Sequence, residues 1–165
     1  MDNPISVLFI CTANICRSPL ATAVFRHKVA QAGLAGRVVI DSAGTHDYRI
    51  GKPPDARAQR VAARRGFGMP EGLARQVARV DLERFHHVLA MDMKNMSVLH
   101  RLGEPDLWQK PKLLMSYSRI YQEREIADPY GADEERFELV LDMIDSATEG
   151  LLAAIRAELQ ARGEG

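Results

Sequence analysis

Near its beginning the sequence reads Ile5-Ser6-Val7-Leu8-Phe9-Ile10-Cys11-Thr12-Ala13-Asn14-Ile15-Cys16-Arg17-Ser18-Pro19. The first six residues are almost continuously apolar and rich in β-branched side chains, which predicts a strand buried on both faces of a sheet. Residues 18–32 then carry a cap residue and a first-turn proline, and a glycine follows them, as is typical of a helix. The stretch therefore predicts a strand, a short polar loop and a helix in direct succession.

Three further apolar runs, at residues 38–40, 85–91 and 112–115, predict more strands, and helical patterns occupy residues 55–65, 94–102 and 133–159. Strands that alternate with helices favour a parallel, doubly wound α/β sheet. We expect a single domain over residues 1–165, a three-layer sandwich whose four-stranded parallel sheet is flanked by helices. Such sheets bind ligands beyond the carboxyl ends of their strands, so the site is expected directly after Ile10.

Composition narrows the class of protein. The chain has 165 residues, of which 46% are hydrophobic, and this suits one compact core. Lys+Arg and Asp+Glu are both 22, so the formal net charge is zero. The chain therefore lacks the long-range electrostatic field that is expected of a general nucleic-acid or membrane binder. No signal-peptide pattern is seen at the start, and no apolar run approaches the ~18 residues of a membrane span. We expect a cytoplasmic monomer or weak dimer that binds neither nucleic acid nor membrane.

The two cysteines, Cys11 and Cys16, are too few and too close together to brace a fold in an oxidising compartment. Their value is therefore chemical rather than architectural. A structural zinc site would need a second pair of ligands, and the five histidines show no such spacing. The sequence predicts neither a metal nor another cofactor.

The loop after the first strand has the features of an anion site. A tight loop at a helix N-terminus directs several backbone N–H groups into one concavity, where the helix dipole favours a phosphate-like anion. The same setting lowers a cysteine pKa from ~8.5 to as little as ~3.5–7.5, so Cys11 is expected to be an ionised nucleophile. The planar fork of Arg17 matches two phosphoryl oxygens. Ser18 either donates a hydrogen bond to the Cys11 sulfur or caps the helix.

With these parts in this order, the sequence resembles the low-molecular-weight protein tyrosine phosphatases, whose phosphate loop follows the pattern C-x-x-N-x-C-R-S. That pattern spans residues 11–18 here, and the resemblance extends through most of the chain to Asp128-Pro129-Tyr130. It implies a metal-independent protein tyrosine phosphatase that hydrolyses phosphotyrosine and small aryl phosphates through a phosphocysteine on Cys11. Its partners would be phosphotyrosine-containing proteins, and a cognate tyrosine kinase is a further candidate.

The resemblance also assigns roles to individual residues. Arg17 would bind the phosphoryl group, while Asp128 would first protonate the leaving group and then act as a base toward water. Tyr48 and Tyr130 would form the walls of a slot for an aromatic phosphoester. The residues expected to bind substrate along the loop are Thr12, Ala13, Asn14, Ile15, Cys16 and Ser18, with Asn14 shaping the loop through hydrogen bonds that include one to Ser42.

Two positions depart from the family pattern. Ala13 stands where glycine is usual, and its Cβ is harmless only if the backbone keeps φ negative. Gly72 stands where many members carry a histidine that supports the loop serine. Both departures bear on the nucleophile rather than on the type of reaction. Cys16 has two interpretations: it protects Cys11 from over-oxidation by forming a reversible disulfide, or it simply packs the loop.

Three other functions use a similar loop. A thiol-dependent arsenate reductase needs relay cysteines downstream, and the sequence has none after Cys16. A protein-arginine phosphatase typically has threonine where this chain has Ile15. A non-catalytic module that binds phosphoanions or senses redox state would gain nothing from a proton donor at Asp128.

Some polar residues have a structural interpretation beside a functional one. Asp92 follows the third predicted strand and either lines the site or caps the next helix. His86 and His87 are expected to be packed or hydrogen-bonded rather than catalytic. Four arginines at helical spacing form either a solvated helix face or a contact for an acidic partner; they are Arg57, Arg60, Arg64 and Arg65.

Overall fold

A four-stranded parallel sheet lies at the centre of the computed structural model, which describes residues 3–163. The strand order is β2-β1-β3-β4, with bounds Val38–Gly44, Ile5–Cys11, His87–Ala90 and Pro111–Leu113 respectively. Every neighbouring pair of strands is parallel. The predicted fold class is confirmed.

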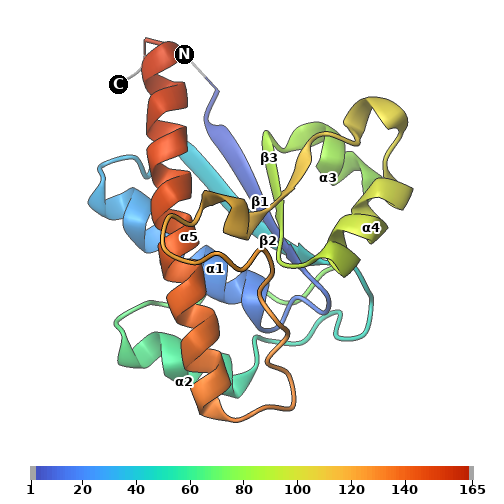
Figure 1. The fold of residues 1–165 in the computed structure, drawn as a ribbon, viewed down its shortest axis with the longest axis vertical. Coiled ribbons are helices and arrows are strands. Elements are labelled where there is room, and N and C mark those ends of the chain that lie inside the picture. The colour runs from blue at the N-terminus through green and yellow to red at the C-terminus, as the bar shows by residue number, and fades with distance from the viewer. Residues whose placement is uncertain (1–2, 164–165) are drawn as a thin grey trace.

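Helices cover both faces of this sheet (Figure 1). One face carries α1 (Arg17–Gln31), α2 (Ala56–Arg64) and α5 (Glu134–Ala161), and the other carries α3 (Arg79–Arg84) and α4 (Met93–Leu102). Two short 3₁₀ turns, Pro105–Leu107 and Leu114–Tyr117, flank β4. Alternate β1 residues enter the two cores: Val7 and Phe9 pack toward α1 and α5, whereas Leu8 and Ile10 pack toward α3 and α4. This explains why the strand is apolar at nearly every position.

The third and fourth strands are shorter than predicted, for local reasons. The predicted strand at 85–91 pairs only over 87–90, because His86 Nδ1 takes the Ser6 backbone N–H at 2.9 Å in place of a ladder partner. The predicted strand at 112–115 ends at Leu113, and the chain then turns into a 3₁₀ helix packed beneath α5. Helix α3 was not predicted, since six residues are too few to show a helical period.

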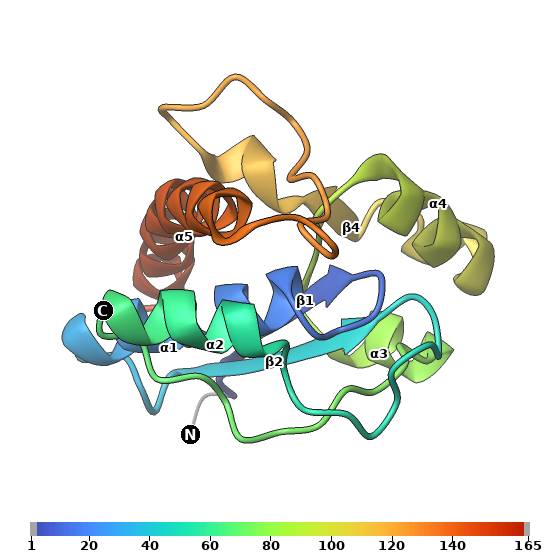
Figure 2. The same ribbon diagram turned by 90° about the horizontal axis from the view of Figure 1, so that it is seen from below.

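The ends of β1 and β2 approach one another closely. The strands run toward the lower end of Figure 1, and Figure 2 views the molecule from that end. Thr45 N donates to Cys11 O at 2.9 Å, which ties the two strand ends together. A Cβ on Gly44 would lie 2.7 Å from Thr12 O, so only glycine lets β2 end against the loop that follows β1.

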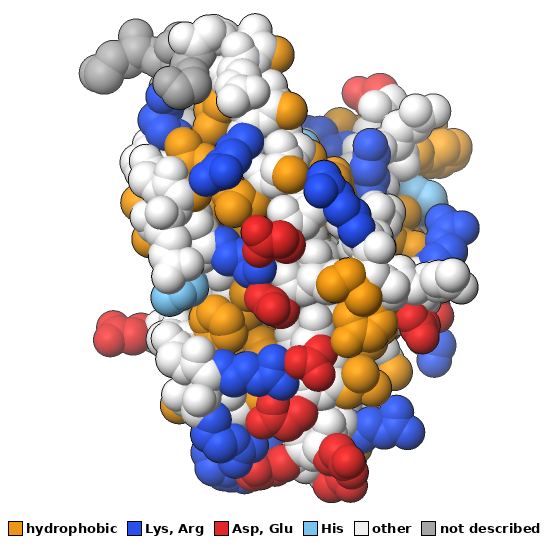
Figure 3. Space-filling view, turned by 60° about the vertical axis from the view of Figure 1, so that its left-hand side comes forward, with side chains coloured by type: hydrophobic (Ala, Val, Ile, Leu, Met, Phe, Trp, Pro, Cys, Tyr) orange, Lys and Arg blue, Asp and Glu red, His pale blue; other side chains and the backbone are white. Residues whose placement is uncertain are grey.

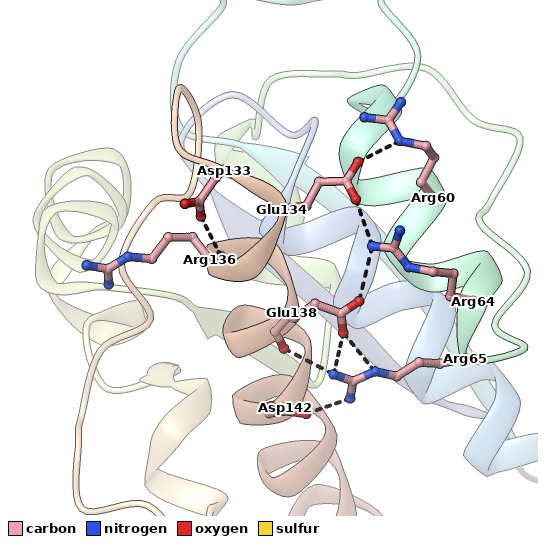
Figure 4. A network of polar contacts seen from close by, with 8 residues as sticks. All are labelled: Arg60, Arg64, Arg65, Asp133, Glu134, Arg136, Glu138 and Asp142. Atoms are coloured by element: carbon pink, nitrogen blue, oxygen red, sulfur yellow. Dashed lines mark hydrogen bonds and ion pairs between the residues drawn. The ribbon is translucent and has the colours of Figure 1, made fainter.

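The arginine cluster at α2 is a solvated face, as one interpretation held, and on it the arginines form a network of ion pairs, with the Arg60 and Arg64 side chains 55% and 51% exposed. Figure 3 shows basic and acidic side chains interleaved along one side of the molecule, and Figure 4 resolves the contacts. The acidic partner is the protein's own α5. The pairs are Arg60 with Glu134, Arg64 with Glu134 and Glu138, and Arg65 with Glu138 and Asp142. Arg57 makes different contacts, which are described below.

Within residues 3–163, no helix has the length and apolar character that a membrane crossing requires.

Candidate active site

Cys11 is the last residue of β1 and lies buried beneath the start of α1. Its Sγ is 3.0 Å from Ser18 Oγ, and Asn14 Nδ2 donates to that same oxygen at 2.8 Å. A hydroxyl that accepts a bond from an amide still has its own proton to donate, so Ser18 can stabilise a sulfur anion. The helix cap position is taken by Cys16, without a side-chain bond. Of the two interpretations of Ser18, the contact with sulfur is the one the structure contains.

Asn14 holds the loop in a backbone conformation that few residues tolerate. Its φ is +60°, and among residues 3–163 it is the one non-glycine residue in the left-handed region. Its side-chain amide also donates to Ser42 Oγ at 2.9 Å and accepts from Arg75 N at 3.0 Å. Ala13 has no positive φ, so its Cβ is accommodated without strain.

Gly72 leaves open space beside this support. A Cβ added there would meet no atom within 4 Å, and the residue lines a cavity of about 140 Å³ together with Asn14 and Ser42. The position that carries histidine in many relatives is thus a void in this protein. The loop depends instead on Ser42 and the Arg75 backbone.

Arg17 is buried, with 1% of its surface exposed, although it begins a helix beside a cavity. Its Nη1 donates to Asp92 Oδ2 and to Ile126 O, both at 2.7 Å, while its Nη2 lies 3.3 Å from Thr12 Oγ1. Burial opposes the charge, but the neighbouring Cys11 and the hydrogen bond to Asp92 raise the pKa of Arg17 above its ordinary value. Arg17 is therefore a buried cation and not a surface charge.

One edge of this guanidinium is left for a ligand. Nη1 is fully engaged, whereas Nε is buried and has no hydrogen-bond partner. Nε and Nη2 together form the fork that binds two oxygens of an anion. Asp92 caps α4 by accepting from Asn95 N at 2.8 Å, as one interpretation held, and it acts on the site by orienting the Arg17 guanidinium.

A cavity of about 420 Å³ opens above Cys11 and Arg17. Its lining residues are Cys11, Thr12, Ala13, Ile15, Cys16, Arg17, Tyr48, Arg49, Asp128 and Tyr130. The predicted residues Asn14, Ser18 and Ser42 do not line it and instead support the loop by their mutual hydrogen bonds. Arg49 was not singled out from the sequence, where nothing distinguishes it from the other arginines.

Asp128 reaches the cavity from segment 127–133, which precedes α5. Its Oδ2 lies 3.8 Å from Arg17 Nη2, and 47% of its side chain is exposed. Its other oxygen accepts from Tyr130 N at 3.1 Å. The carboxyl group thus lies at the mouth of the cavity, beside the guanidinium and above the sulfur-bearing loop.

The two tyrosines at the mouth are exposed and are held in different ways. Tyr48 is 66% exposed and stacks on His46 with ring centroids 4.9 Å apart. Tyr130 is 53% exposed, and its hydroxyl accepts a hydrogen bond from Arg49. The Arg49 and Arg57 guanidinium carbons lie 5.3 and 5.9 Å from the Tyr130 ring centroid, within cation–π range.

Cys16 lines the same cavity but is held as a thiol. Burial raises the pKa of Cys16, and the charges of Asp55 and Cys11 raise it further. Both cysteines are free. The loop therefore presents one cysteine bonded to a serine hydroxyl and another whose ionisation is suppressed.

A second hollow of about 1160 Å³ adjoins the first across Arg17 and Asp128. Asn95 lies on its wall and donates to Thr12 Oγ1 at 3.2 Å, while its own buried Oδ1 has no partner. The mouth of the cavity thus continues into a second hollow on the side of Asp92 and Asn95.

Taken together, the arrangement places a cysteine sulfur, a guanidinium fork and a carboxyl group around one cavity. Within residues 3–163, no cluster of three or more His, Cys, Asp or Glu side chains is arranged to hold a metal ion.

Comparison with known proteins agrees with this geometry. A family model described as "Low molecular weight phosphotyrosine protein phosphatase" matches residues 6–161. The Bacillus subtilis low molecular weight protein-tyrosine-phosphatase YfkJ is 39% identical over 94% of this chain and 99% of its own length. The crystal structure of YfkJ has a TM-score of 0.89 over 95% of this chain and 98% of its own.

Two further solved structures are similar. A protein tyrosine phosphatase from Entamoeba histolytica, with Hepes in its active site, has a TM-score of 0.90 at 30% identity and covers 93% of this chain and 98% of its own. A Drosophila arginine phosphatase has a TM-score of 0.83 at 30% identity and covers 90% of this chain and 96% of its own.

Proposed function

The chain belongs to the family of low molecular weight phosphotyrosine protein phosphatases, enzymes that need no metal ion, and we propose that it hydrolyses protein phosphotyrosine through a phosphocysteine on Cys11. The observation that carries the proposal is the buried Arg17, clamped by Asp92 and Ile126 with its Nε unpartnered. A buried cationic donor without a partner is costly unless an anionic ligand completes it. A phosphoryl group bound above Cys11 would do so.

The first step forms the S–P bond. The Cys11 thiolate attacks phosphorus while the bond to the phenolic oxygen breaks, and Asp128 gives its proton to that oxygen. Arg17 and the N–H groups at the start of α1 hold the equatorial oxygens as their charge is redistributed. Ser18 stabilises the thiolate before the attack through the 3.0 Å contact.

The second step returns the enzyme to its initial state. Asp128, now a carboxylate, takes a proton from water as the water oxygen attacks phosphorus and the S–P bond breaks. The electron pair returns to Cys11, where the Ser18 hydroxyl again donates to it. Inorganic phosphate leaves, and Asp128 carries the proton needed for the next cycle.

The cavity mouth favours an aryl ester. Tyr48 and Tyr130 offer aromatic surface, and the apolar Ile15 of the loop also lines the cavity. The similarity to a Drosophila arginine phosphatase keeps phosphoarginine as the second candidate substrate. A guanidinium would place N–H donors against Ile15, which offers no side-chain acceptor, so phosphotyrosine is the better match.

Several narrower assignments are part of the same proposal. A cytoplasmic location and a cognate tyrosine kinase follow from the chemistry of the substrate and from the need for a reduced Cys11. A protective disulfide between Cys16 and Cys11 stays a prediction, supported by the shared cavity and the two free thiols.

The test measures hydrolysis of aryl phosphates and of matched phosphotyrosyl and phosphoarginyl peptides, with a chelator present. We expect turnover with the aryl and phosphotyrosyl substrates and a loss on the order of 10⁴- to 10⁶-fold in Cys11→Ser. A folded Cys11→Ser protein should still bind inorganic phosphate, which separates lost chemistry from lost structure. Turnover that persists in Cys11→Ser would contradict the proposal, and preference for phosphoarginine would favour the second candidate.

A further inference from the structure

Arg57 differs from the other arginines of α2 in what it contacts. Arg60, Arg64 and Arg65 pair with acidic side chains along the exposed side of α5, as Figure 4 shows. Arg57 lies at the first turn of α2 and points toward the cavity mouth, where it meets backbone and aromatic groups. Its contacts join three parts of the site that are distant in sequence.

The first link runs from the phosphate loop to α2. Asp55 N donates to Ile15 O at 2.8 Å, so the residue before α2 is fixed on the loop that holds Cys11. The Asp55 carboxylate caps α2 by accepting from Arg57 N at 2.8 Å. Any movement of the phosphate loop relative to α2 would break one of these bonds.

The second link is an ion pair between side chains. Arg57 Nε lies 3.2 Å from Asp55 Oδ1, and its Nη2 lies 3.1 Å from Oδ2, which is the two-pronged geometry typical of strong pairs. The side chains are only 28% and 12% exposed. Burial opposes ionisation of Asp55, but the Arg57 hydrogen bonds lower the pKa of Asp55 below its ordinary value.

The third link reaches segment 127–133. Arg57 Nη1 donates to Ala132 O at 2.8 Å, and the guanidinium carbon lies 5.9 Å from the Tyr130 ring centroid and 5.0 Å from that of Phe137. At the other end of this segment, Ile126 O accepts from Arg17. Asp128 therefore lies between two anchors, both of which are arginines bonded to backbone carbonyls.

We propose that Arg57 is a positioning residue that docks segment 127–133 onto the phosphate loop through Asp55 and so holds Asp128 over the leaving group. The inference rests on the proposed function, since it assigns Asp128 as the acid. Asp128 is half exposed, and its contact with the phosphate loop is a long ion pair with Arg17 at 3.8 Å rather than a hydrogen bond, so its position depends largely on the anchoring of its segment. Proton transfer is sensitive to such placement, because an error of ~1 Å can cost about 10²-fold in rate.

The test compares Arg57→Met with Arg65→Met. Methionine keeps an apolar stem over Phe137 but removes the fork, and Arg65 pairs only with α5, away from segment 127–133. With phenyl phosphate we expect Arg57→Met to lower kcat about 10- to 100-fold and Arg65→Met to leave kcat near the wild-type value. The inhibition constant of inorganic phosphate should stay unchanged in both, because the phosphate loop is intact.

A leaving-group series separates positioning from general damage. Across aryl phosphates of increasing phenol acidity, the loss caused by Arg57→Met should shrink, as it should for Asp128→Asn. Asp55→Asn keeps the cap and the backbone bond to Ile15, so it should show the same trend, and the double variant should be no worse than Arg57→Met. If Arg57→Met fails to fold, Arg57→Lys, which keeps the charge but not the fork, should give a smaller loss with the same trend.

The outcomes distinguish this inference from the proposed function. A uniform loss across the series, or an equal loss in Arg65→Met, would overturn the docking role of Arg57 while leaving the phosphatase assignment intact. Wild-type protein without aryl phosphatase activity would overturn both.

Discussion

Residues 11–18, which form and support the floor of the cavity, are mostly buried, whereas the side chains of Tyr48, Asp128 and Tyr130 at its rim are about half exposed or more. The floor is held by short hydrogen bonds of Asn14 and Arg17, one within the loop to Ser18 and others to Ser42 and Asp92 of neighbouring segments. The rim is held by residues from other segments, among them Arg49 and Arg57.

This difference indicates a division of labour. Every phosphate monoester presents the same PO₃ group to the floor, so a rigid and dry floor can serve all substrates. Esters differ in the group that meets the rim. We therefore expect substitutions in the floor to lower the rates of all substrates by a common factor, and substitutions at the rim to change the ranking of substrates.

The largest effect that tests this division is expected for Arg17→Lys. A lysine ammonium cannot bond to Asp92 and Ile126 while also presenting a fork to the phosphoryl group. We expect kcat/KM to fall by about 10³-fold, by the same factor for phenyl phosphate and for more reactive aryl phosphates. Steady-state kinetics over such a series measures both the loss and its uniformity.

Arg26→Lys is the matched control, because Arg26 lies on the same helix but donates to Ile40 O at 3.3 Å and does not line the cavity above Cys11. Its activity should equal that of the wild type. A loss in Arg17→Lys that depends strongly on the leaving group would contradict this distinction, because the floor would then also discriminate between esters.

A smaller effect is expected at the rim from Tyr130→Leu and Tyr48→Leu. Each replacement removes aromatic contact with the ester ring, which is worth ~0.5–1.5 kcal/mol, so KM for aryl phosphates should rise about 2- to 10-fold. The inhibition constant of inorganic phosphate, which meets only the floor, should not change. Tyr130→Leu should have the larger effect, because Tyr130 is held in place by two arginines and Tyr48 by one stacked histidine. Equal weakening of inorganic phosphate would show that the two regions are not independent.

The floor was far more predictable from sequence than the rim. Its residues are contiguous, and a strand, a polar loop and a helix in succession determine where their backbone N–H groups point. The two interpretations of Asp92 could be stated because it follows a predicted strand directly. Its partner Arg17 was expected at the site from its place on the loop.

The rim depends on contacts between segments that are distant in sequence, and local sequence patterns do not show which of these segments come together in space. Asp128 was assigned only through the family resemblance, since an Asp-Pro pair alone is typical of turns. Arg49 and Arg57 carry no sequence signal that separates them from the other arginines. Arg57 and Arg65 are eight residues apart, slightly more than two helical turns, yet Arg57 bonds to segment 127–133 and Arg65 pairs with α5.

The last prediction concerns stability, and it tests whether the floor excludes water from the Cys16 thiol. Burial and neighbouring negative charge raise the pKa of Cys16 in the folded protein, whereas in the unfolded chain its pKa is ~8.5. Above that pH the unfolded chain has released a proton that the native state still holds. This part of the free energy of unfolding is fully present below pH ~8.5 and is lost as the pH rises, by up to about 1.4 kcal/mol per pH unit.

Urea unfolding of wild type and Cys16→Ala between pH 7 and 10, under reducing conditions, should therefore show the two stabilities converging or crossing as the pH increases. A difference in stability that stays constant over this range would mean that water reaches the Cys16 thiol, and the floor could not then be described as sealed beneath an open rim.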